Sequence, residues 1–143
     1  MKILESQSAI MTNVEVYQFL SKQQKEYQKK NRKGPETFEV LRKDVLQYFE
    51  THPNPLSQKP LPFDTTALPT MMKKLRPYQI SKGELIMIFN IRPTSTAALN
   101  VVLENMEDRF SPETQEEILG VITEVLGQFP QEPEENGQED SPA

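Results

Sequence analysis

The side chains able to do acid–base, nucleophilic or metal chemistry are few in this chain of 143 residues. There is no cysteine, and the single histidine, His52, stands next to a proline-rich stretch. Without a thiol or a second histidine, neither a Ser–His or Cys–His nucleophilic centre nor a zinc site can be assembled in its usual form. The five glycines are scattered and make no phosphate-binding loop. We therefore expect no catalytic residue, no metal ion and no cofactor, and we interpret His52 as a surface residue.

Carboxylates remain as candidates for general acid–base work. They occur in two groups at helical spacing, where a solvated helix face is the usual explanation. No partner group that would hold a metal or a substrate accompanies them. The members are Glu104, Glu107 and Asp108 in the first group, and Glu113, Glu116 and Glu117 in the second.

Basic residues could contact phosphate groups instead. One run covers residues 22–33, and a second cluster consists of Lys73, Lys74, Arg76 and Lys82. Only Tyr27 and Tyr78 are available nearby for base stacking. The net charge is −5, but residues 1–103 hold 15 Lys/Arg against 9 Asp/Glu, whereas residues 104–143 hold 12 acids against Arg109 alone. The acidic end opposes a phosphate backbone, so we expect at most weak nucleic-acid contact, with Lys73, Lys74, Arg76 and Lys82 as its candidates.

Helix signals place these residues on an all-α framework with a first helical part at residues 1–52. Thr12 and Glu15 have capping-box spacing, with Met11 and Val16 in the positions of a hydrophobic staple. The helix that follows is expected to bury Val16, Phe19 and Leu20 and to end at Gly34–Pro35. A second helix is expected over residues 36–50, and its apolar stripe is Phe38, Leu41, Val45, Tyr48 and Phe49.

The prolines between Pro53 and Pro62 predict an extended linker over residues 53–63, followed by a helical bundle over residues 64–129. Ser81 and Glu84 form a second capping box, which favours a helix over a buried strand for the apolar run 85–89. Four short helices are expected in the bundle, with Leu99, Val102, Leu103 and Met106 sharing one of them. We expect Pro69 in the first turn of its helix and a disordered acidic tail over residues 130–143.

The start of the chain carries apolar residues without a core of their own. Residues 1–4 form a short apolar stub, which suggests docking onto another protein and the addition of a strand to a sheet edge. No apolar run reaches the length of a membrane span or a signal peptide, so we expect a soluble intracellular protein without membrane contact.

Three sets of residues resemble the small stalk subunit family of RNA polymerases, with the polymerase III branch favoured. The first is Met1-Lys2-Ile3-Leu4 with residues 10–16 and Phe19-Leu20. The second runs from Ile80-Ser81-Lys82-Gly83-Glu84-Leu85 to Asn90-Ile91-Arg92-Pro93. The third comprises Glu104, Arg109-Phe110-Ser111 and residues 116–119. Together the resemblance covers about residues 1–20 and 64–129, whereas residues 21–63 match nothing.

The resemblance implies a nuclear, non-catalytic subunit related to the small stalk subunit of archaeal RNA polymerase. Its N-terminal tip-associated hairpin, with a short strand, would dock on a larger OB-domain stalk subunit as a heterodimer. A bundle of the helicase and ribonuclease D C-terminal type would follow, and contacts with the polymerase core and initiation factors would assist transcription initiation. The residues that would face the larger subunit are Ile3, Leu4, Ile10, Met11, Val16 and Leu20. Arg92 and Pro93 would shape a turn between helices, and Arg109 would hold the closing helix pair.

Two alternatives stay open. One is a free-standing helical nucleic-acid-binding module, and the other is the equivalent stalk subunit of RNA polymerase II. Two departures from the family pattern also stand out, Gly83 in the first turn of a helix and Pro69 in another.

Overall fold

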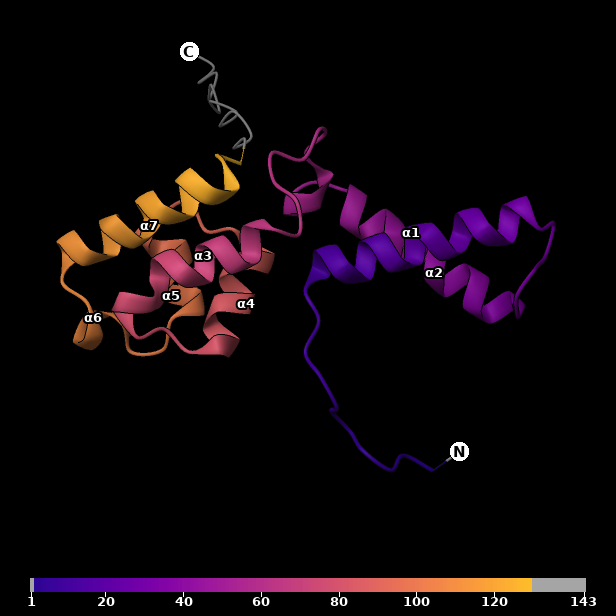
Figure 1. Ribbon diagram of the computed structural model, residues 1–143, viewed down its shortest axis with the longest axis horizontal. Helices are drawn as coiled ribbons and strands as arrows, with labels where there is room; N and C mark the ends of the chain where they lie inside the picture. The colour runs from indigo at the N-terminus through magenta and orange to yellow at the C-terminus, as the bar shows by residue number, and fades with distance from the viewer. Residues whose placement is uncertain (1, 130–143) are drawn as a thin grey trace, which may run out of the picture.

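The computed structural model describes residues 2–129, and within that range the secondary structure is entirely helical (Figure 1). The all-α expectation is confirmed. A helical hairpin stands on one side of the molecule and a compact lobe of shorter helices on the other, with an irregular segment joining them. The helices, in chain order, are α1 (Asn13–Lys29), α2 (Glu36–Glu50), η1 (Pro55–Ser57), α3 (Ala67–Leu75), η2 (Arg76–Tyr78), α4 (Lys82–Ile91), α5 (Thr96–Val102), α6 (Met106–Arg109) and α7 (Pro112–Leu126).

The hairpin consists of α1 and α2, and α1 begins at the expected capping box. The backbone N–H of Glu15 donates to the Thr12 hydroxyl, and the Thr12 N–H donates to the Glu15 carboxylate at 2.7 Å. Tyr17 meets Phe49 edge-on, which brings the start of α1 against the end of α2. The two helices therefore run antiparallel and are held together at their open end.

Several expectations for the hairpin core are wrong. Phe19 is exposed, and on α2 Leu41 and Tyr48 face outward with 60% and 67% of their surface accessible. The side chains buried from α2 are instead Arg42, Leu46 and Phe49. The apolar stripe of α2 is broader than the face that α1 covers, so spacing alone did not select the buried side.

The lobe packs α3 against α7, with α4 and α5 beneath them. Its seven largest fully buried side chains, all with less than 2% of their surface exposed, come from four helices: Met71, Leu75, Ile88, Leu99, Ile118, Ile122 and Leu126. The run 85–89 is helical, as the capping box of Ser81 and Glu84 predicts. Pro69 lies in the first turn of α3, also as expected.

One expected helix of the lobe is divided. The helix α5 ends at Val102, Asn105 takes a left-handed conformation with φ of 52°, and α6 starts at Met106. Leu103 and Met106 are both buried, so the apolar pattern identified core residues correctly but placed them in a single helix.

The proline-rich segment is more than a spacer. The Asn54 side chain caps the turn η1, and Leu56 within it is 2% exposed and belongs to the same core cluster as the lobe. Leu61 and Phe63 also pack on that core. The segment is therefore folded against the lobe rather than extended in solvent.

Two expectations concern the ends of the chain. Residues 2–12 form neither helix nor strand, so the expected N-terminal strand is not present in the isolated chain. The expected disorder of residues 130–143 lies outside the described residues. Among residues 2–129, no helix has the length and apolar character needed to cross a membrane.

Candidate partner-binding surface

Exposed apolar residues precede the first helix. Ile3 and Leu4 have 77% and 89% of their surface accessible, and Ile10 and Met11 each have 53%. They lie on a segment without regular structure, directly before the buried N-cap residue Thr12. All four side chains are therefore large, apolar and exposed to water on one short segment of the chain. Four of the six predicted interface residues are thus available for docking.

The other two predicted interface residues are partly covered by the chain itself. Val16 and Leu20 on α1 are half-buried, and Val16 packs against the core cluster. Asn13, at the start of the same helix, donates its backbone N–H to the Asn90 side chain of α4 at 2.9 Å. This bond ties the start of the hairpin to the lobe.

The structure adds exposed apolar residues that the sequence interpretation missed. Phe19 on α1 and Val40, Leu41 and Tyr48 on α2 are all largely accessible. The width of the apolar stripe on α2 could have indicated these residues. The stripe is too wide to be covered by one neighbouring helix, which suggests that a second contact covers the rest.

Arg92 occupies the junction between the lobe and the proline-rich segment. It ends α4 in a left-handed conformation with φ of 54°, and only 2% of its surface is exposed. Its Nε donates to the Gly127 carbonyl oxygen at 3.1 Å, and its Nη1 donates to Gln58 Oε1 at 2.6 Å. The guanidinium also lies over the ring of Phe63, with 5.5 Å from Cζ to the ring centroid.

This environment explains two features of the junction. Burial lowers the pKa of Arg92, and the charge is held by carbonyl oxygens and aromatic faces. Gly127, the C-cap of α7, has φ of 73°, and a Cβ there would lie 3.1 Å from Pro62. Arg92 therefore joins the end of α4 to the end of α7 and to the linker, while Pro93 after it is buried. The sequence placed both residues at a turn and missed Gln58, which the fold brings from 34 positions away.

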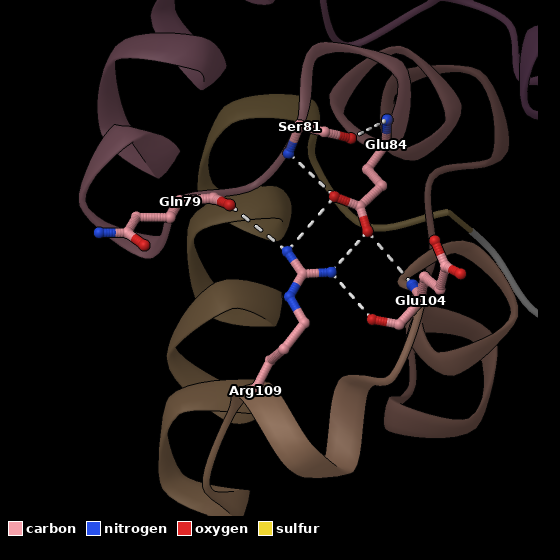
Figure 2. A network of polar contacts seen from close by, with 5 residues as sticks. All are labelled: Gln79, Ser81, Glu84, Glu104 and Arg109. Carbon is pink, nitrogen blue, oxygen red and sulfur yellow. Dashed lines mark hydrogen bonds and ion pairs between the residues drawn. The ribbon is translucent and has the colours of Figure 1, made fainter.

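Arg109 is the centre of a second network, at the opposite end of α4 (Figure 2). Its Nη1 donates to Glu84 Oε1 at 2.6 Å and to the Glu104 carbonyl oxygen at 2.9 Å. Its Nη2 reaches the Gln79 carbonyl oxygen at 3.4 Å. Because these groups come from the end of η2, α4 and the α5–α6 turn, a single arginine holds three elements together.

Glu84 acts in this network as both a helix cap and an ion-pair partner. Burial of the carboxyl group raises its pKa. The hydrogen bonds from Arg109, Ser81 and the Glu104 N–H together outweigh this effect and lower the pKa to about 2. The Glu84 carboxylate in turn raises the pKa of Arg109. The network is structural in character, because its groups are satisfied by other parts of the lobe.

The candidate nucleic-acid residues do not form a closed site. Lys73, Lys74, Arg76 and Lys82 are all exposed, and they lie on α3, η2 and α4. Lys74 is paired with Glu124 of α7 at 2.6 Å, and this carboxylate competes with any phosphate for the same ammonium group. Across residues 2–129, no group of three or more His, Asp or Glu side chains is placed to hold a metal ion.

The sequence as a whole was compared with known proteins. Residues 10–126 match the family described as RNA polymerase Rpb4. The chain belongs to the RNA polymerase Rpb4 family. It is 24% identical over 138 residues to DNA-directed RNA polymerase III subunit rpc9 of Schizosaccharomyces pombe, an alignment that covers 91% of this chain and 100% of that protein. The resemblance to the small stalk subunits of RNA polymerases is thereby confirmed.

The match to the Rpb4 family covers both regions of the structure. The matched region spans both the hairpin and the lobe, and it includes the stretch 21–63 for which the motifs alone gave no match. The exposed apolar residues of the N-terminal segment and hairpin therefore belong to a protein that works inside a larger assembly.

Proposed function

We propose that this chain is the non-catalytic small stalk subunit of nuclear RNA polymerase III. It forms a heterodimer with a larger OB-domain stalk subunit and presents a surface to initiation factors. The pair joins the polymerase core and acts as a scaffold in transcription initiation. The alignment with rpc9 over the whole of that protein supports the polymerase III branch, and a nuclear location goes with it.

The observation that carries the proposal is the exposed apolar N-terminal segment. Ile3, Leu4, Ile10 and Met11 lie in water and take no part in the core cluster that joins the hairpin and the lobe. Burial of such residues is worth about 1.5–3 kcal/mol per side chain, which is enough to drive a stable heterodimer when several act together. An extended segment with unpaired backbone groups is also suited to join the edge of a sheet in the larger subunit.

Arg92 supports docking indirectly. Arg92 fixes the linker against the end of α7, and Asn90, two residues earlier, accepts the bond from Asn13 at the start of α1. The lobe thereby sets the position from which the N-terminal segment extends toward the larger subunit.

The test is co-expression of this chain with the larger polymerase III stalk subunit, followed by purification in high salt. We expect a one-to-one complex with the parent sequence. The double variants Ile3→Asp/Leu4→Asp and Ile10→Asp/Met11→Asp should each weaken it by about 30-fold or more, the equivalent of about 2 kcal/mol. Val101→Asp is the matched control, because Val101 on α5 is 78% exposed but lies on the lobe.

Each outcome has a clear meaning. A complex that survives high salt and loses affinity only in the two N-terminal variants supports apolar docking. Recovery with polymerase II subunits would assign the other branch. Binding to nucleic acid that weakens steeply with salt, with no complex formed, would favour the free-standing nucleic-acid module instead.

A further inference from the structure

A basic groove runs along one side of the hairpin and is not used by the docking surface. It has a volume of about 940 Å³ and lies between α1 and α2. Its lining is Tyr17, Gln18, Ser21, Lys22, Gln24, Lys25, Glu26, Lys29, Lys43, Leu46, Gln47 and Glu50. Neither the exposed apolar residues Phe19, Val40, Leu41 and Tyr48 nor the N-terminal segment contributes to it. The hairpin thus has two chemically different sides.

The charge of the groove is positive along most of its length. Lys22, Lys25, Lys29 and Lys43 line it, and within residues 2–129 none of the four forms an ion pair. The acids Glu26 and Glu50 also line it, and the Glu50 carboxylate already accepts the Tyr17 hydroxyl at 2.7 Å. With four lysines and two glutamates in its lining, the groove has a net positive charge and suits an anionic ligand.

Lys59 adds a fifth positive charge at the end of the groove nearest the lobe. Its Nζ donates to the Tyr17 hydroxyl at 3.1 Å and lies 4.8 Å from the centroid of the same ring. This end is therefore both basic and aromatic.

Phe129, the residue before the acidic segment, packs on His52 just after the end of α2. The Phe129 ring stacks on His52 at 5.5 Å between centroids, with 12° between the ring planes. His52 follows α2 by two residues, and Glu50, the last residue of α2, lines the groove. Residues 130–143 hold five acids and no Lys or Arg. The last described residue thus packs on a residue close to the end of α2, the helix whose last residue lines the groove.

A second groove close to the end of α7 has the opposite character. It is lined by Asp64, Glu124 and Lys74, among neutral residues, so acids outnumber bases there. An acidic segment leaving Phe129 is repelled from that side and attracted to the hairpin side.

The distances allow the contact. Residues 17–29 of α1 span about 18 Å along the helix axis, whereas residues 130–143 can extend over about 45 Å. A tethered ligand of this length has an effective concentration in the millimolar range, so weak ion pairs suffice to keep it bound. We propose that the acidic segment 130–143 binds in the basic groove between α1 and α2 of the same chain. This inference does not rest on the proposed function.

The test uses the full chain with a single spin label. Because the sequence has no cysteine, Gln138→Cys creates a unique labelling site. Paramagnetic broadening of the amide signals is then measured across residues 2–129. We expect several-fold intensity loss for residues around Lys22, Lys25 and Lys43 at low salt, and recovery at high salt because the Debye length shortens to about 3 Å at 1 M.

Charge variants decide whether the groove is the binding site. The quadruple variant Lys22→Gln/Lys25→Gln/Lys29→Gln/Lys43→Gln should abolish the broadening, whereas Lys73→Gln/Arg76→Gln/Lys82→Gln, which removes exposed bases of the lobe, should leave it intact. A stop after Phe129 should shift the amide signals of the groove residues. Broadening spread evenly over both basic clusters, broadening that persists in the quadruple variant, or unshifted groove signals after truncation would overturn the proposal.

Discussion

The hairpin and the lobe bury their side chains in different ways. In the lobe, α3, α4, α5 and α7 each contribute fully buried apolar side chains to one core. In the hairpin, large apolar residues of α1 and α2 remain exposed, and the buried set includes Arg42, of which only 3% is accessible. Two helices alone cannot enclose a core, because each covers only one stripe of the other.

The hydrogen bonding of the arginine side chains also differs between Arg109 in the lobe and Arg42 in the hairpin. Arg109 in the lobe is surrounded by acceptors from three elements. Arg42 in the hairpin pairs with Glu39 and lies between the rings of Tyr27 and Phe38, but its Nε and Nη1 have no hydrogen-bond partner within the described residues. Unpaired buried donors are costly. Arg92, where the lobe meets the linker, also leaves its buried Nη2 without a hydrogen-bond partner among the described residues, so the two buried arginines share a feature that the exposed Arg109 lacks.

The largest expected effect comes from separating the two regions. We expect a peptide of residues 1–52 to be largely unfolded, because Val14 and Phe49 lose the lobe residues with which they form one cluster. A chain of residues 53–129 should fold and unfold cooperatively. Circular dichroism with thermal melting of both fragments checks this. A stable, cooperatively melting helical peptide 1–52 would show that the hairpin folds without the lobe.

The next effect compares one leucine from each region. Leu99→Ala should lower the free energy of unfolding by about 2–5 kcal/mol, because Leu99 is fully buried in the lobe. Leu41→Ala in α2 should change it by about 0.5 kcal/mol or less, because most of Leu41 is exposed. Urea unfolding of the full chain measures both values. Equal losses would mean that the hairpin is packed as tightly as the lobe.

A smaller effect concerns pH and is confined to the lobe. The pKa of Glu84 is lowered from 4.5 to about 2 in the folded chain, so its contribution to stability is complete above pH 4.5. It is lost as the pH falls from 4.5 toward 2. We expect the free energy of unfolding of Glu84→Gln to be lower than that of the parent by about 1–3 kcal/mol at neutral pH. This difference should vanish as the pH falls across that window.

The control for the pH experiment is Glu116→Gln, which removes an exposed carboxylate from α7 of the same lobe. The free energy of unfolding of this variant should stay close to that of the parent at every pH. If the Glu84→Gln difference were independent of pH between 2 and 4.5, the ion pair with Arg109 would not carry the stabilisation.

The sequence predicted those features that depend on neighbouring residues. The capping boxes at Thr12 and Ser81 are both present. These signals are reliable because a cap joins a side chain to backbone groups only three positions away. The exposed apolar residues ahead of α1 could also be recognised, since no adjacent segment offers them a core.

Other features were predicted incorrectly because they depend on distant residues. Which side of α2 is buried follows from the position of α1, so Leu46 points inward and Leu41 outward. At the break near Asn105, Arg109 binds the Glu104 carbonyl oxygen while pairing with Glu84 twenty-five residues earlier.

Four features follow from the sequence alone: the helical class, the starts of the principal helices, the separation of charge and the family to which the chain belongs. Each of these depends on residue types or on spacings of a few positions. Three features are seen only in the folded chain: the proline-rich segment packs on the lobe, Arg92 joins Gln58 to Gly127, and Phe129 stacks on His52. The hydrogen bonds of Arg92 join residues separated by 30 positions or more along the chain. Residue spacing cannot predict them, because they form only when the helices pack.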